Sequence, residues 1–317
     1  MISFRFHVVS ITAIFLAIAI GVVVGSTYVD GAVVDGLRSR IRTVEGNVSD
    51  ARDENGRLED QLQSTREYVD LSSEYAVTDR LTDVPVFLTA ARGVDEATVE
   101  RTLVLARQAG GIVPGIVWLE QRWAADGDED LEDLALIVGG SATDARDVLW
   151  ASAWEDITDE LVAGAGAQDP DGGDASILAQ LEEAGFLTVD PLDDETVGLD
   201  DLIGAAPRVA IVTGARAEEE VAPVVPVAVT ASVDAGLVTV VGDVYVAAPE
   251  APGRGATLTE SFDDAVREAT VIVDDVDLEA GRVAVVLGMD AAAEGETGRH
   301  YGYGDGADAV LPAWTPP

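Results

Sequence analysis

Acidic residues that could carry acid–base chemistry gather after two apolar runs of this chain. Asp274, Asp275 and Asp277 follow the run Val271-Ile-Val273, and Asp243 follows the run that ends at Val241. Because α/β folds place their sites at the carboxyl ends of parallel strands, these carboxylates could meet at one edge of a sheet and share a proton. The simpler interpretation, which we favour, is that Asp274 ends a strand and Asp277 caps the next helix.

His300 and Tyr301, in Gly298-Arg-His-Tyr-Gly302, complete the candidate ligand or structural site. A single histidine can act as a general base, but a catalytic triad also needs an oriented serine, and no G-x-S-x-G sequence is present. We expect both rings to pack on the domain with their polar tips hydrogen-bonded. No catalytic residue is predicted; the alternative is a carboxylate-dependent wall hydrolase that uses Asp243, Asp274 and Asp275.

Ligands for metals and phosphate groups are sparse. The chain has no cysteine, and its histidines and methionines are His7, His300, Met1 and Met289. Two acidic runs, 126–130 and 169–174, lack the glutamate that a calcium loop needs at its twelfth position, and we interpret them as solvated loops. The glycines in 164–169 lack the third glycine of a dinucleotide fingerprint. We predict no metal site and no cofactor.

The charge balance limits the partners of the protein. The 317 residues carry 59 Asp and Glu against 19 Lys and Arg, a formal net charge of -40. Such a surface repels phosphate backbones, which makes binding to nucleic acid improbable. It suits a cell surface, a cation-rich wall or a salt-adapted organism. Hydrophobic residues make up 48% of the chain, enough for a folded core.

An uncharged apolar stretch opens the chain. Residues 8–29 contain no charged side chain and span roughly 30 Å as a helix, the thickness of a hydrocarbon core. We predict a short N-terminal stub and a transmembrane anchor over residues 1–29; the competing interpretation is a cleaved signal peptide. Arg5 favours an N-terminus inside the cell, but Arg38, Arg40 and Arg42 lie close to the other end, so the charges alone leave the orientation open.

A heptad pattern follows, and it predicts a coiled coil over residues 30–76. β-Branched side chains at position a and leucine at position d favour two strands. In a parallel homodimer Arg40 would face Glu45, but Glu54 would face Glu59, which leaves a weak homodimer and a different partner helix both open. A third alternative is a helix that packs on its own domain. The partner-binding seam consists of Leu37, Ile41, Val44, Val48, Asn55, Leu58 and Leu62.

From Pro85 onward apolar strands alternate with helices, which predicts an α/β fold: a mainly parallel sandwich domain over residues 84–294. The Gly- and Pro-rich tail, 295–317, is expected to be irregular, either wrapped on the domain or loose. The expected strands are residues 86–90, 112–119, 186–189, 208–213, 237–241 and 271–273. The expected helices are residues 95–109, 130–138, 144–163, 176–184, 222–234 and 278–293.

The opening sequence MISFRFHVVSITAIFLAIAIGVVVGS resembles that of the actinobacterial MctB/SteB family. Further similarity lies in Val273-Asp-Asp-Val-Asp277, in Gly281-Arg-Val283, and in the ending His300-Tyr-Gly302 with Leu311-Pro312. The similarity extends over nearly the whole chain. It implies a protein anchored in the cytoplasmic membrane, with its N-terminus inside and the bulk of the chain on the periplasmic or cell-wall side.

Two functions follow from the resemblance. One is copper transport or homeostasis, proposed to use an outer-membrane channel. The other is that of a SteB-like scaffold, which acts with a SteA-like membrane partner to control a septal peptidoglycan hydrolase in cell division. Copper favours thiolate, thioether or imidazole ligands, of which the chain beyond residue 29 offers only Met289 and His300. We therefore favour the non-enzymatic division regulator.

Overall fold

The computed structural model describes residues 4–164, 176–191, 198–214, 221, 223–244, 262–304 and 306–313, without the side chains of residues 26–33. The chain divides into two compact units, Met1–Arg66 and Glu67–Pro317. The predicted fold class is confirmed. An apolar helical segment stands where the transmembrane helix was predicted, and the helix continues beyond it. The α/β domain contains a mixed, mainly parallel sheet.

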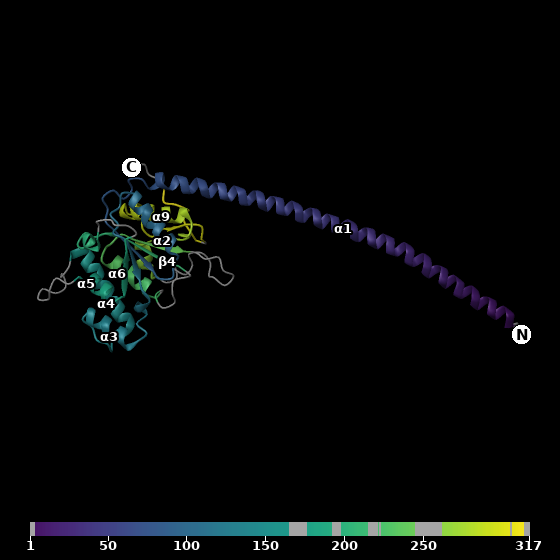
Figure 1. Cartoon of the computed structure of the whole chain (residues 1–317), viewed down its shortest axis with the longest axis horizontal. Helices are drawn as coiled ribbons and strands as arrows, with labels where there is room; N and C mark the ends of the chain where they lie inside the picture. Colours follow the sequence, from purple (N-terminus) through teal and green to yellow (C-terminus); the bar gives the residue numbers. More distant parts are fainter. Residues whose placement is uncertain are drawn as a thin grey trace. The chain divides into compact units, whose positions relative to one another are not determined.

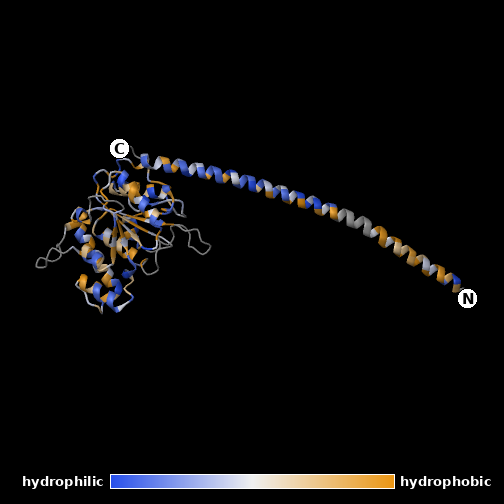
Figure 2. Cartoon of the chain, in the orientation of Figure 1, coloured by the Kyte–Doolittle hydropathy of each residue, from blue (hydrophilic) through white to orange (hydrophobic). Residues whose placement is uncertain are grey.

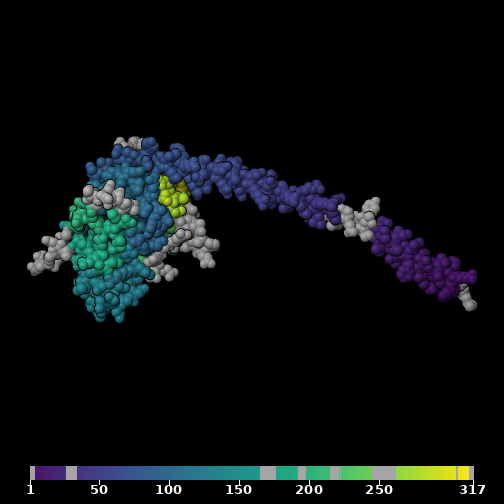
Figure 3. All heavy atoms as spheres, in the orientation of Figure 1, coloured from purple at the N-terminus to yellow at the C-terminus, as the bar shows by residue number. Residues whose placement is uncertain are grey.

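One helix, α1 (Phe4–Val77), forms the described part of the first unit and the beginning of the second (Figure 1). No proline precedes Pro85, so nothing in this stretch removes a helical hydrogen bond. Its first 22 residues, Phe4–Gly25, are apolar and numerous enough to cross a membrane, and Figure 2 shows them as an orange segment. From residue 34 onward the helix in the first unit is predominantly hydrophilic, with apolar positions at intervals (Figure 2). Figure 3 draws the same helix as spheres, coloured by residue number.

The end of α1 packs on the α/β domain. Ser73 and Val77 are buried, and the Ser73 hydroxyl lies 3.2 Å from the Arg101 guanidinium. Gln108 donates a hydrogen bond of 3.0 Å to Glu74. The interpretation of the helix as packing on its own domain therefore holds for this last part of α1.

The domain is built on a sheet whose strand order is β3-β2-β1-β4-β5-β6-β7. All neighbouring strands in this order are parallel except β3, which runs antiparallel to β2. The first strand, β1, lies in the middle of the sheet. The chain adds β2 and β3 on one side of β1 and then β4 to β7 on the other, so the strand order reverses between β1 and β4. The strands are β1 (Val86–Ala91), β2 (Ile116–Leu119), β3 (Leu187–Asp190), β4 (Arg208–Gly214), β5 (Thr239–Val244), β6 (Val271–Val273) and β7 (His300–Tyr301).

Helices cover both faces of the sheet, which explains why most strands are continuous apolar runs. The helices α2 and α9 pack together on one side, and α4 and α6 pack together on the other (Figure 1). The described helices of the domain are α2 (Glu96–Gln108), η1 (Gln121–Ala124), α3 (Asp128–Ile137), α4 (Arg146–Ala163), α5 (Ile177–Glu183), η2 (Leu199–Leu202), α6 (Val224–Asp234), α8 (Asp264–Ala269) and α9 (Glu279–Ala293).

Several boundaries differ from those predicted. The tail expected to be irregular contains β7, because a strand of two residues is too short to produce an alternating pattern. Helix α8 was not predicted, and β2 begins only at Ile116, while Ile112 makes an isolated bridge to Pro85. The helix expected despite its prolines is confirmed as α6. Pro226 stands in its first turn, where no intrahelical N–H donor is needed.

Candidate functional site

The carboxyl edge of the sheet brings several of the predicted site residues together. Asp243 lies near the end of β5, Asp274 and Asp275 directly follow β6, and His300 begins β7. Asp274 and Asp275 are fully buried, whereas Asp243 and His300 are each 8% exposed. The backbone joins these ends as well, since the Val276 N–H donates to the Asp243 carbonyl at 3.0 Å.

Asp274 is the centre of this cluster. Its carboxylate accepts hydrogen bonds from Tyr303 N–H at 2.7 Å and from Gly304 N–H at 2.8 Å, and it lies 2.9 Å from His300 Nε2. The loop after β7 can wrap this closely because Gly302 has φ 131° and no side chain. A Cβ atom at this position would lie 1.7 Å from Asp274 Oδ1.

The electrostatics of Asp274 favour its charged form. Burial raises the pKa of the carboxyl, but hydrogen bonds from His300, Asp275, Tyr303 and Gly304 outweigh burial and lower the pKa to about 2. A carboxylate held this strongly ionised is a poor general acid or base near neutral pH. We therefore interpret the cluster as a structural clasp that fastens β7 and its loop to β6.

The remaining predicted residues occupy different surroundings. The expectation that Asp277 caps α9 is wrong: Leu278 is the N-cap residue without a side-chain cap, and the Asp277 carbonyl instead accepts a 2.6 Å hydrogen bond from Arg282. The tight backbone turn at Asp275 (φ 57°) shifts the start of the helix. Tyr301 is buried, and burial with the nearby Glu296 carboxylate raises the pKa of its hydroxyl.

Of the two acidic runs, the structure describes residues 126–130, where two of the carboxylates form ion pairs. Asp126 pairs with Arg146 at 3.0 Å, and Asp130 pairs with Arg122 at 2.7 Å. Residues 169–174 and 165–169 lie outside the described ranges. Over the residues that the structure describes, no three His, Cys, Asp or Glu side chains are grouped so that they could hold a metal ion.

The side chains with the chemistry that copper prefers lie in separate places. Met289 is 1% exposed in α9, and His300 is engaged with Asp274. His7 lies in the apolar part of α1.

Exposed apolar side chains are concentrated on α1. The predicted seam is solvent-exposed from Leu37 (54%) to Leu62 (52%). Nearer the domain, Tyr68, Leu71 and Tyr75 are 72%, 76% and 84% exposed; we call these three residues the tyrosine patch. Because these residues are three and four positions apart, they lie next to one another on the surface of the helix. Helices that bind a partner place their anchor residues in this way. This patch was not predicted from the sequence, although the spacing of its three residues can be read there.

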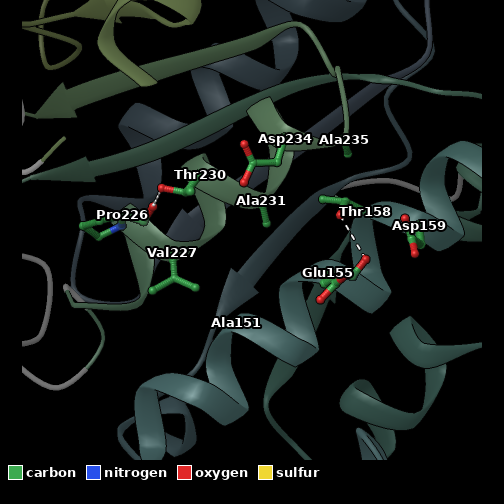
Figure 4. A pocket seen from close by; sticks show the side chains of 10 residues that line it. All are labelled: Ala151, Glu155, Thr158, Asp159, Pro226, Val227, Thr230, Ala231, Asp234 and Ala235. Carbon is green, nitrogen blue, oxygen red and sulfur yellow. Dashed lines mark hydrogen bonds between the residues drawn. The ribbon is translucent and has the colours of Figure 1, made fainter. Parts of the chain in front are cut away.

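A groove of about 510 Å³ separates α4 from α6 (Figure 4). Pro226, Val227 and Ala231 line one side, while Glu155 and Asp159 line the other. Two lining hydroxyls are already used, because Thr158 and Thr230 donate to backbone carbonyls of their own helices.

The acidic side of this groove also affects a neighbouring carboxyl group. Burial, together with the charges of Glu155 and Asp159, raises the pKa of Asp156 to about 6. The groove thus carries an excess of negative charge on α4.

Comparison with known proteins places this architecture in a family. A family model described as "Copper transport outer membrane protein, MctB" matches residues 1–312. The copper transporter MctB of Mycobacterium tuberculosis (strain H37Rv) is 28% identical over 332 residues, which covers 98% of this chain and 99% of that protein. The copper transporter MctB of Mycobacterium leprae is 31% identical over 336 residues, with the same coverage of both chains. The chain therefore belongs to the MctB family, a family of copper transport proteins and not of enzymes.

Proposed function

We propose that this protein is a membrane-anchored scaffold of the cell envelope, which serves copper handling through contacts with other proteins and not by carrying copper itself. One observation carries the proposal: the exposed apolar side chains are concentrated on α1, whereas Met289 and His300 are both buried and His300 is engaged with Asp274. Copper sites need several soft or imidazole ligands around one ion. The names of the matched relatives support copper handling as the process.

The proposed topology has Phe4–Gly25 as a single span in the cytoplasmic membrane, with the N-terminus inside. The unit Glu67–Pro317 then lies on the periplasmic or cell-wall side. The length and composition of the apolar segment support the span. The net charge of -40 suits a surface that faces a cation-rich wall.

Direct copper binding is the first test. Purified full-length protein is equilibrated with copper(I) or copper(II), passed through a desalting column, and analysed for bound metal. We expect far less than one copper per chain, and the same amount in a Met289→Leu, His300→Gln variant, whose glutamine amide can still donate to Asp274. Retention of about one copper per wild-type chain, lost in the folded variant, contradicts the scaffold proposal.

The tyrosine patch provides the second test. In a host strain that lacks its own copy, a Leu71→Ala, Tyr75→Ala variant should restore copper tolerance less well than the wild type, because exposed aromatic anchors dominate many protein contacts. Leu136→Ala is the matched control, since Leu136 is 81% exposed on α3 and outside the patch. Equal copper tolerance with all three chains would exclude the patch as a partner surface.

A second candidate function is control of septal peptidoglycan hydrolysis in division, together with a SteA-like membrane protein. The observation that favours it is α1 itself, a helix of 74 residues that joins an apolar segment to a domain with a buried carboxylate cluster. A helix of this kind has the form of a spacer that positions or recruits other proteins.

Partner capture tests this candidate. Tagged full-length protein is recovered from its own membranes, as wild type and as Leu58→Pro, which breaks an exposed helix. Recovery of a SteA-like protein or a wall hydrolase with the wild type alone supports the division role. Failure to recover either protein with the wild type removes this candidate and leaves the copper process.

A further inference from the structure

The seam of α1 is an apolar surface that the described part of the first unit leaves uncovered. Along residues 34–62, the large seam side chains are between 42% and 59% exposed: Val34, Leu37, Ile41, Val44, Val48, Leu58 and Leu62. They recur at positions a and d of four complete heptads and at the first position of a fifth, and they face one side of the helix. A stripe of this length on an otherwise hydrophilic helix is typical of a surface buried by a second helix.

The pattern of side chains favours a two-stranded parallel partner. Val34, Ile41 and Val48 are β-branched residues at a, and leucine stands at the first and last d positions, Leu37 and Leu58, with Val44 and Ala51 at the two between them; β-branched residues at a with leucine at d favour parallel dimers. Asn55 occupies an a position, where it can hydrogen-bond to the same residue of an identical helix. An asparagine at this position fixes both the register and the number of strands.

The charges that flank the seam also fit a second copy. Arg40 at g would face Glu45 at e of the partner helix, an opposite-charge pair. In such a dimer the carboxylates of Glu54 and Glu59 would repel each other. This repulsion is reduced, because Arg57 of the same helix donates to both oxygens of Glu54, at 2.9 and 2.5 Å. Local neutralisation of Glu54 weakens the repulsion that opposed self-association.

The structure also shows where the seam ends. Beyond Leu62, Thr65 at d is still exposed, but Val69 at a and Ser72 at d are half-buried, and Val77 is fully buried. The last three residues belong to the unit that contains the α/β domain. A partner helix would therefore use the seam only up to Leu62 and would leave the packing of the domain unchanged.

We propose that residues 34–62 form a parallel, in-register, two-stranded coiled coil with a second copy of this chain. The parallel direction rests on the proposed anchor, because two chains held by the same N-terminal span must enter the coil from the same side. The dimer itself does not depend on whether the protein serves copper handling or cell division.

The absence of cysteine in the native sequence makes disulfide cross-linking a direct test. Full-length Leu58→Cys and Leu37→Cys, both at d, are oxidised mildly in membranes, with Asp53→Cys on the outer face of the same helix as the matched control. In a parallel dimer each d cysteine meets its own copy at disulfide distance. We expect about tenfold or more cross-linked product for the d variants than for Asp53→Cys, because the dimer raises their effective concentration.

The product must have twice the mass of the 33.0-kDa chain and contain two differently tagged copies when both are expressed together. Cross-linking of Leu58→Cys and Leu37→Cys no greater than that of Asp53→Cys overturns the proposal. Cross-linking to a different protein also overturns it, and shows a heteromeric coil. Neither result bears on the copper-binding or partner-capture tests, so failure of the dimer is distinguishable from failure of the proposed function.

Discussion

At the scale of single residues, Asp274 decides how the last part of the chain is held. Its buried carboxylate lies within hydrogen-bonding distance of the His300 ring and accepts from the backbone N–H groups of Tyr303 and Gly304. Gly302 makes this possible, because a side chain there would overlap the carboxylate. An unpaired buried charge is costly, and these partners offset that cost. The carboxylate therefore stabilises the fold only while all of its partners are in place.

Replacing Asp274 by Asn should lower the free energy of unfolding by about 3 kcal/mol. The reason is that the NH2 group of the Asn amide, a donor, would face the N–H groups that now donate to the carboxylate. Urea unfolding followed by tryptophan fluorescence measures this, since all five tryptophans follow residue 66. The control is Glu132→Gln, an exposed carboxylate on α3. A loss no larger than that of the control would show that the clasp contributes little.

The same carboxylate predicts a pH dependence. Its pKa falls from 3.8 to about 2 on folding, so its contribution is fully present above about pH 4 and is lost as the pH falls toward 2. The wild type should lose about 2 kcal/mol over this range that Asp274→Asn does not lose. Parallel pH profiles for the two proteins would contradict this assignment.

Gly302→Ala should destabilise the domain strongly, because its Cβ would overlap the Asp274 carboxylate. Gly306→Ala is a close control: Gly306 also has a positive φ, 92°, but no atom lies within 4 Å of the added Cβ. Gly306→Ala should therefore show mainly the backbone cost of about 1 kcal/mol. Thermal unfolding of both variants separates backbone strain from the close approach, and equal effects would remove the steric explanation.

At the scale of elements, Arg101 connects three helices. Its guanidinium contacts Ser73 of α1 and Glu279 of α9 from its own position in α2, with the shortest Arg101–Glu279 distance at 2.6 Å. Burial raises the pKa of Glu279, but hydrogen bonds from Arg101 and Arg282 outweigh it and lower the pKa overall. The end of α1 is thus joined to the domain through a partly buried ionic network.

Arg101→Ala should reduce the free energy of unfolding by about 2 kcal/mol, because Glu279 keeps only Arg282 as its charged partner. Combining it with Glu279→Gln in a double-mutant cycle tests the coupling, which should exceed about 0.5 kcal/mol. Additive effects of the two substitutions would show that the ion pair is not a source of stability. Urea unfolding gives both quantities.

At the scale of the whole molecule, the excess of carboxylates opposes compaction. The described arginines are paired locally with Asp or Glu in many places, but 19 basic residues cannot balance 59 acidic ones. The raised pKa of Asp156, caused by burial and by Glu155 and Asp159, is a local sign of this repulsion. Screening by salt should therefore favour the folded state.

We expect the unfolding temperature of the domain to rise between 0.02 and 0.5 M sodium chloride, by about 3 °C for each kcal/mol of relieved repulsion. Calorimetry in the two buffers measures the shift. The same change in Asp156→Asn should be smaller, since one of the repelling charges is gone. A constant or falling unfolding temperature would show that local ion pairs, which salt weakens, outweigh the net repulsion.

The sequence by itself determined the features that depend on local pattern. The uncharged stretch, the heptads of α1 and the alternation of apolar runs with helices all follow from spacing along the chain, and the prediction of α6 succeeded because its two prolines stand before or within its first turn. The place of Asp274 at the end of a strand could be anticipated, because it directly follows a short apolar run, and the packing of His300 on the domain was expected without a strand.

Only the tertiary structure decided how those residues act. Strand β7 is defined by its neighbour β6, not by a pattern of its own. The lowered pKa of Asp274 comes first from the hydrogen bond of His300, then from Asp275 and from the N–H groups of Tyr303 and Gly304, so three of these partners lie 26 to 30 residues further along the chain. Likewise, the heptad pattern cannot show that Val69 is half-buried and Val77 fully buried, whereas the apolar seam side chains from Leu37 to Leu62 are exposed. Long-range contacts set burial and charge environment, and these are not encoded in any one stretch of sequence.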